Sequence, residues 1–137
     1  GTIAASSLLA HGGMSERIYE IYVPYAQRAV NEYLREIPEK YASIETATKL
    51  AQMAYSRNPN RNAIGMGVSC SLCKVGGERE YRENVVHICI VDKTRKYEET
   101  YSVKEEFKND RFKQETMCST LIVYELLRFI KNDYTTE

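Results

Sequence analysis

Two cysteines at C-x-x-C spacing and a Gly-Gly pair lie close together in the stretch GVSCSLCKVGG, which runs from Gly67 to Gly77. Paired cysteines at this spacing occur in zinc knuckles and in redox dithiols. Adjacent glycines instead allow a backbone loop to turn its amides toward an anion. The stretch therefore indicates a metal site, a redox centre or a ligand-binding loop, and the rest of the sequence must separate them.

A zinc site needs about four nitrogen or sulfur ligands. Beyond Cys70 and Cys73, the candidate ligands are scattered singly along the chain: His11, His87, Cys89 and Cys118. A redox dithiol usually follows a strand at the start of a helix, whereas this pair lies on an expected strand and precedes a charged loop. We therefore expect no metal and no cofactor, and interpret the pair as small structural residues, with Cys70 in the core. A thiol redox or zinc protein is the weaker alternative.

The residues around Cys70 alternate strictly between large and small side chains, which predicts a strand over residues 64–72. One face of this strand is bulky and the other is nearly bare. The bare face consists of Gly65, Gly67, Ser69 and Ser71. Such a face leaves room for a closely packed helix or for a ligand, and we favour tight packing followed by an ordinary turn.

Other elements must position this strand. Periodicity and turn residues predict helices over 3–10, 26–37, 43–58 and 110–132, and further strands over 18–23, 85–91 and 96–103. Ser43 is a suitable N-cap, and His87 is interpreted as a hydrogen-bonded core histidine. Leu121 to Ile130 is apolar almost all round, so it lies in the core or in a dimer. This order predicts a layered α/β domain around a mixed sheet of about four strands.

Length and composition set limits on the function. A chain of 137 residues with 43% hydrophobic content can form one domain with its own core. Nineteen basic residues balance nineteen acidic ones, which disfavours a nucleic-acid binder. The apolar run Leu121 to Tyr124 is far too short to cross a bilayer, so no membrane partner is expected. Four cysteines are few for a secreted scaffold, which indicates a reducing, cytoplasmic setting.

Several short motifs, taken in order, carry a resemblance to a known family. They are Gly1-Thr2-Ile3-Ala4, Gly13-Met14-Ser15, Val23-Pro24-Tyr25, Tyr41 to Ala47, and Gly67 to Leu72 with Gly76-Gly77. The first resembles the end of a Ser-x-Thr-Gly-Gly-x-Ile-Ala motif, and the last resembles a Val-Thr-Gly-Ile-Ala-Gly-Pro-Gly-Gly loop. Together they resemble a diverged branch of the C-terminal domain of the CinA (competence/damage-inducible) proteins, which include nicotinamide mononucleotide deamidases.

This resemblance implies a three-layer α/β/α sandwich over residues 1–137 that lacks its first strand and first motif upstream of Gly1, and that forms a homo-oligomer. It implies an amidohydrolase that splits the carboxamide C–N bond of a pyridine nucleotide and releases ammonia. The substrate-binding residues it implies are Gly1, Thr2, Ser69, Gly76 and Gly77. Ser69 and Tyr25 are the candidates for catalysis.

The chain also departs from the family pattern at positions that chemistry needs. The family's nucleophilic serine would precede Gly1, and Val30 stands where a lysine is expected. Glu115 stands near an expected arginine, with Arg111 close by. A general base contributes about 10²–10⁴ in rate, and valine cannot accept a proton. We therefore expect impaired or absent catalysis. The alternative is a non-catalytic nucleotide-binding, regulatory or oligomerisation domain.

Overall fold

The structure is a computed structural model that describes residues 2–10, 17–72, 84–103, 105–108 and 110–131. This part of the chain is mixed α and β. Its elements, in order, are α1 (Thr2–Leu9), α2 (Gln27–Leu34), α3 (Ile44–Arg57), β1 (Gly65–Ser71), β2 (Val85–Val91), β3 (Lys96–Ser102), the short 3-10 helix η2 (Glu105–Phe107) and α4 (Arg111–Lys131). The prediction of an α/β domain is confirmed.

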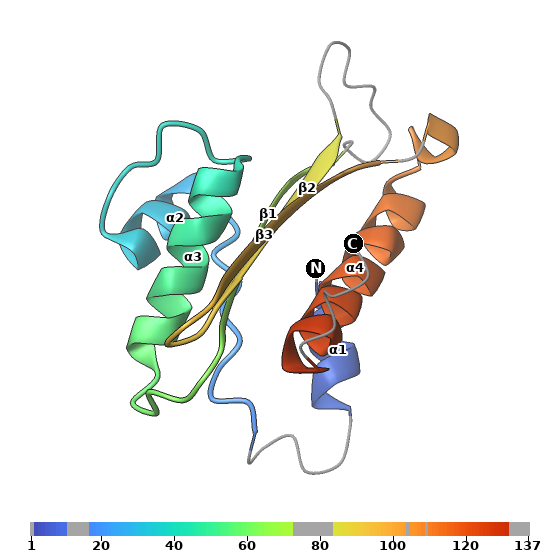
Figure 1. Cartoon of the computed structure of the whole chain (residues 1–137). Helices are drawn as coiled ribbons and strands as arrows, with labels where there is room; N and C mark the ends of the chain where they lie inside the picture. Colours follow the sequence, from blue (N-terminus) through green and yellow to red (C-terminus); the bar gives the residue numbers. More distant parts are fainter. Residues whose placement is uncertain (1, 11–16, 73–83, 104, 109, 132–137) are drawn as a thin grey trace.

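The three described strands form one antiparallel sheet in the order β1-β2-β3. Figure 1 shows α2 and α3 on one side of this sheet and α1 and α4 on the other. The register places Gly67 opposite Cys89, and Cys89 opposite Glu98. A mixed sheet of about four strands is therefore not what the described residues form, since every pairing among them is antiparallel.

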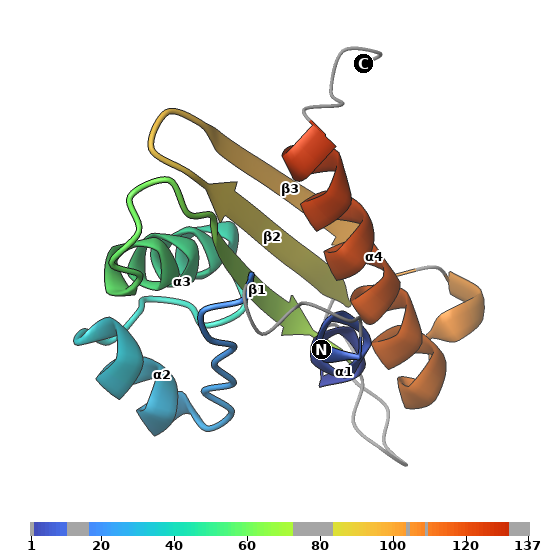
Figure 2. The ribbon, with the colours of Figure 1, turned by 90° about the horizontal axis from the view of Figure 1, so that it is seen from below.

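The expected strand over residues 18–23 is the source of this difference, and that prediction was wrong. The segment has no regular secondary structure and is paired with none of the described strands. Figure 2 shows it running between α2 and α1. Its side chains hold it instead: Arg57 donates to both carboxylate oxygens of Glu20 at 2.6 and 3.1 Å. The guanidinium also lies over the rings of Tyr22 and Tyr33, whose centroids are 4.6 Å apart. The aromatic residues that suggested a strand in this segment therefore take part in side-chain stacking, and the backbone pairs with none of the described strands.

Helix α2 is shorter than its apolar pattern predicts. It ends at Leu34, because Arg35 adopts a left-handed conformation (φ 60°) and its N–H bonds the carbonyl of Asn31. Ile37, expected on the buried stripe, is 77% exposed. The helix therefore stops before Pro38 for a local reason, a left-handed C-cap, that the apolar spacing does not reveal.

Helix α3 begins where the sequence predicts. The Ser43 hydroxyl accepts from the Thr46 N–H at 3.1 Å and donates to the Lys40 carbonyl at 2.8 Å. Glu45 lies in the first turn, where its charge suits the positive end of the helix. This confirms Ser43 as the N-cap of α3. The Thr46 N–H, which has no partner within the helix, is bonded to the Ser43 hydroxyl.

We expect Ser43→Ala to lower the free energy of unfolding by about 1 kcal/mol, because the Thr46 N–H would lose its partner inside a buried turn. Urea denaturation measures the loss. Ser56→Ala is the matched control, since Ser56 is exposed on the same helix and bonds only within it. Equal losses in the two variants would contradict the capping role.

The bare face of β1 packs directly under α3. A Cβ built on Gly67 would lie 2.5 Å from the Ala51 nitrogen and closer still to the Ala47 carbonyl oxygen. A Cβ on Gly65 would lie 2.6 Å from the Tyr55 nitrogen. Tight helix packing, favoured from the sequence, is confirmed for these two positions.

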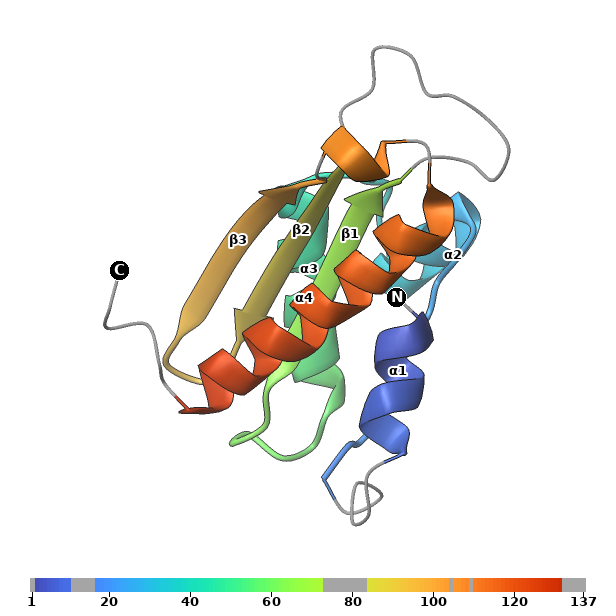
Figure 3. The ribbon, with the colours of Figure 1, turned by 90° about the vertical axis from the view of Figure 1, so that its right-hand side faces the viewer.

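The opposite face of the sheet carries the larger core, which α4 covers as it crosses the strands diagonally (Figure 3). Its buried members are Ala4, Leu72, Val86, Ile88, Ile90, Cys118, Ile122 and Phe129. The outer side of α4 exposes about half of Tyr124, Leu127 and Ile130. The apolar middle of this helix therefore divides between the core and the surface. No helix of the described residues is long and apolar enough to span a membrane.

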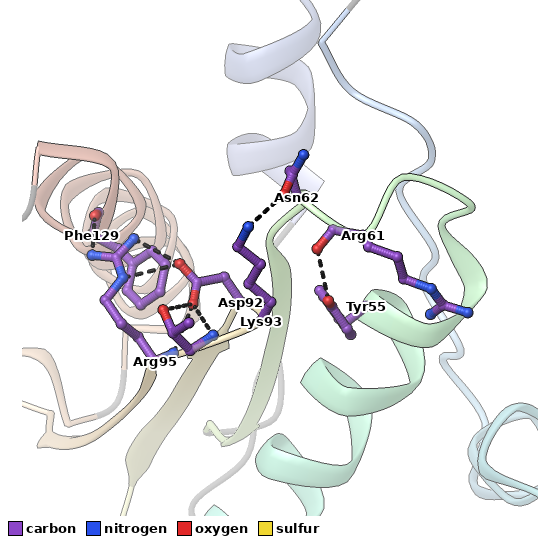
Figure 4. A network of polar contacts seen from close by, with 8 residues as sticks. Tyr55, Arg61, Asn62, Asp92, Lys93, Arg95 and Phe129 are labelled. Carbon is purple, nitrogen blue, oxygen red and sulfur yellow. Dashed lines mark hydrogen bonds and ion pairs between the residues drawn. The ribbon is translucent and has the colours of Figure 1, made fainter.

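The turn between β2 and β3 is tied to the end of α4, as Figure 4 shows. Arg95 donates to the Asp92 carboxylate at 2.9 Å and to the Phe129 carbonyl at 3.0 Å, and its guanidinium lies 3.8 Å from the centroid of the Phe129 ring. A cation suits the negative end of a helix. This contact holds α4 against the far end of the sheet, away from the segment described next.

Candidate functional site

A cavity of about 2150 Å³ lies along β1 and reaches the extended segment at residues 17–25. In the described sheet β1 has a strand neighbour on one side only, so this cavity borders its free edge. Residues from both faces of β1 line it, together with parts of α1, α2 and α4. Both sequence-predicted catalytic candidates, Ser69 and Tyr25, lie in its wall.

Ser69 is buried, with 9% of its surface exposed, and its hydroxyl donates a short hydrogen bond to the carbonyl of Tyr41. A backbone carbonyl can accept this bond but cannot remove the proton. A serine nucleophile needs a base in that place. The geometry therefore gives Ser69 a structural bond that fixes the chain before α3 against β1.

The register adds a histidine that the sequence did not connect with Ser69. His87 is the direct partner of Ser69 across β1 and β2, and its Nδ1 lies 2.8 Å from the Thr100 hydroxyl on β3. Ser69, His87 and Thr100 thus form a polar row across three strands. His87 is hydrogen-bonded, as predicted, but it is half-buried and does not belong to the buried core.

Tyr25 is 91% exposed. It precedes α2 at the end of the extended segment rather than at the end of a strand. The cavity brings Tyr25 and Ser69 into one wall, and among the described residues the acceptor of the Ser69 hydroxyl is the Tyr41 carbonyl rather than a base.

The other predicted binding residues are only partly described. Thr2 is the first residue of α1. Gly1, Gly76 and Gly77 lie outside the described residues, as does Cys73. The loop expected to present its amides to an anion is therefore a prediction that the structure leaves open.

Two positions at which the resemblance expects other residues, Val30 and Glu115, also line this cavity. Val30 contributes an apolar side chain from α2. Arg111 and Glu115 contribute an ion pair, 3.3 Å between Nη2 and Oε2, from the start of α4. The expected lysine and arginine would both have faced the same space.

Cys70 differs from its prediction: it is exposed, not in the core. Within the described part of the chain β1 has one strand neighbour, β2, and the end of β1 lines the cavity. The Cys70 thiol interacts with that of Cys118 from α4, and this hydrogen bond, aided by Arg111, lowers the pKa of Cys70 to about 7. The same interaction and burial raise the pKa of Cys118. Among the described residues, no three His, Cys, Asp or Glu side chains cluster as metal ligands.

Tyrosine rings are a further feature of the cavity wall. Five of them line it: Tyr19, Tyr22, Tyr25, Tyr33 and Tyr41. Charged side chains of both signs accompany them, including Arg17, Lys40, Glu20 and Glu39. Flat amphipathic rings offer stacking surfaces for an aromatic ligand, with hydroxyls available for hydrogen bonds.

Comparison of the chain with protein-family models, with curated proteins and with solved structures gave no match. The resemblance to the CinA family stays a prediction. The function therefore has to be inferred from the cavity beside β1 and from the groups that line it.

Proposed function

We propose that this chain is a non-catalytic, CinA-like domain that binds a pyridine nucleotide, or a nucleotide with a similar aromatic ring, in the cavity beside β1. One observation carries the non-catalytic part: the Ser69 hydroxyl donates a hydrogen bond to the Tyr41 carbonyl. Amide hydrolysis requires an activated nucleophile and a base. In this structure the Tyr41 carbonyl accepts the hydrogen bond of the Ser69 hydroxyl, at the place where a catalytic base would be needed.

The binding part is supported by the composition of the cavity wall. Stacking of a base on an aromatic side chain contributes about 1–3 kcal/mol, and it tolerates different bases. The tyrosines supply such surfaces, while Ser69 and Thr100 supply hydroxyls. The mixed charges of the wall make stacking, rather than net charge, the main source of affinity. At about 2150 Å³ the cavity exceeds the roughly 300–1,000 Å³ of most ligand pockets, so a nucleotide would fill only part of it.

The second candidate is an active CinA-type amidohydrolase. It is favoured by the fact that Arg111, which lies close to the position where the resemblance expects an arginine, lines the same cavity as Ser69, whereas Val30 in the place of the expected lysine counts against turnover. The two candidates share a ligand and a cavity. They differ only in whether the nucleotide is hydrolysed, and an assay of ammonia release distinguishes them.

We expect nicotinamide mononucleotide to raise the Tm of the chain while ammonia release stays at the level of buffer. Tyr25→Ala should weaken binding by about tenfold, because one stacking surface is lost. Calorimetric titration of the nucleotide into each variant measures this. The matched control is Tyr124→Ala, which removes a half-exposed tyrosine on α4 outside the cavity and should leave the affinity unchanged.

Each outcome decides one part of the proposal. Ammonia release above buffer would overturn the non-catalytic assignment and favour the enzyme. Absence of any Tm shift or heat of binding would overturn nucleotide binding. Equal weakening by Tyr25→Ala and Tyr124→Ala would place the ligand outside this cavity.

A further inference from the structure

Two thiols from distant parts of the chain meet at the cavity wall. Cys70 lies near the end of β1, and Cys118 lies in the first half of α4. Both line the cavity, and their side chains interact with each other. Both are free thiols in this structure. The sequence directed attention to Cys70 and Cys73, whereas the fold brings Cys70 to Cys118.

The two thiols have different access to solvent. Cys70 is exposed to the cavity, whereas Cys118 is fully buried at 0% exposure. The hydrogen bond from Cys118 is the largest of the effects that lower the pKa of Cys70 to about 7, and the charge of Arg111 contributes to a smaller extent. A lowered pKa increases the share of Cys70 that is thiolate, and the thiolate is the reactive form. An oxidant entering the cavity reaches Cys70 first.

We propose that Cys70 and Cys118 are an oxidisable pair that reacts with a hydroperoxide and closes to a disulfide joining β1 to α4. The Cys70 thiolate attacks one peroxide oxygen, the O–O bond breaks, and Cys70 becomes a sulfenic acid while hydroxide leaves and takes a proton. The Cys118 sulfur then attacks the Cys70 sulfur and loses its proton, and the sulfenic oxygen leaves as water. Two thiols are oxidised, and one hydrogen peroxide is reduced to two waters.

The third described cysteine supplies a contrast within the same fold. Cys89 is fully buried on the α3 face of the sheet, among Ala47, Ala51 and Val91. Burial raises the pKa of its thiol. A buried thiol with a raised pKa is inert toward peroxide, so Cys89 serves as an internal negative control.

The test treats the reduced, folded chain with a small excess of hydrogen peroxide and analyses an unreduced proteolytic digest by mass spectrometry. We expect a disulfide-linked peptide that joins residues 70 and 118, in the original chain and equally in Cys73→Ser and Cys89→Ser. In Cys118→Ala the reaction should stop at a Cys70 sulfenic acid, which dimedone traps. Because the original chain itself gives the linked peptide, the test does not depend on any variant folding.

A second measurement follows the thiolate directly. Alkylation of Cys70 by iodoacetamide at pH 7 should slow by about tenfold in Cys118→Ala, because the pKa returns toward the ordinary value of about 8.5. A Cys70–Cys73 link, unmodified Cys70 after peroxide, or an unchanged alkylation rate would each overturn the proposal. Nucleotide binding is not used in either readout, so the proposal stands or fails independently of the proposed function.

Discussion

Gly67→Ala is expected to lower the Tm of the chain by about 10 °C or more. The added Cβ would lie 2.5 Å from the Ala51 nitrogen and nearer still to the Ala47 carbonyl oxygen, both of which are backbone atoms of α3. Backbone atoms cannot rotate away, so the helix itself must shift. Overpacking of this kind costs about 1–3 kcal/mol and more where the neighbours are rigid, and a loss of this size is expected in a thermal melt.

The sign of the change is diagnostic. Replacing glycine by alanine at an uncrowded strand position would stabilise the fold by about 0.4–1 kcal/mol, through the lower entropy of the unfolded chain. The second variant, Gly67→Ala with Ala47→Gly, tests which atoms collide. Removing the Ala47 side chain should not rescue stability, because the closest atom belongs to the Ala47 backbone. A rise in Tm for Gly67→Ala would show that α3 does not contact the strand.

Glu125→Ala is expected to destabilise the fold by about 3–5 kcal/mol. Glu125 has no exposed surface, and its carboxylate accepts a short hydrogen bond from the Tyr101 hydroxyl and lies 3.4 Å from Arg128. Removing one member of a buried charged cluster leaves the others without their partner in a medium of low polarity. Chemical denaturation should show a clear fall in midpoint, and Glu125→Gln, which keeps an acceptor for Tyr101, should lose less.

Glu115→Ala is the matched control on the same helix. Its ion pair with Arg111 is partly exposed, so the loss should be below about 1 kcal/mol. Tyrosine titration gives a second readout. Burial and the charge of Glu125 raise the pKa of Tyr101 and of Tyr97. Their pKa values should fall in Glu125→Gln but stay above the ordinary value, because burial, the larger cause, remains, and tyrosinate absorbance measures this fall. Similar losses for Glu115→Ala and Glu125→Ala would contradict a special role for the buried carboxylate.

The direction of the pH dependence follows from the same shift. The folded state holds the tyrosine protons more tightly than the unfolded state does. This stabilisation is fully present below the ordinary tyrosine pKa of about 10, and it is lost as pH rises above that value. In Glu125→Gln this alkaline loss should be smaller.

Local signals in the sequence were sufficient for much of the fold. Ser43 marks the start of α3 because an N-cap acts on amides within three residues. The alternation of β1 reports its two faces because side chains alternate along any strand. By contrast, the unpaired state of residues 18–23 depends on Arg57, a residue far along the chain, and no local pattern reports it.

The candidate site was harder to predict for the same reason. Ser69 meets His87 through the register of β1 and β2, and the stretch that joins these strands is too long for turn chemistry to set a register. Cys70 meets Cys118 only because α4 crosses the sheet on that side. Sequence spacing drew attention to Cys73 because it is near in the chain, whereas proximity in space follows from the packing of elements.

The two walls of the cavity beside β1 differ in rigidity. One wall is a strand of the sheet, locked under α3 by glycines that admit no side chain. The other wall is the segment at residues 17–25. Arg57 of α3 forms an ion pair with Glu20 of this segment and lies over the rings of Tyr22 and Tyr33. Salt weakens exposed ion pairs, whereas it leaves buried packing nearly unchanged. Raised ionic strength should therefore loosen the attachment of the segment at residues 17–25, while it leaves β1 packed against α3.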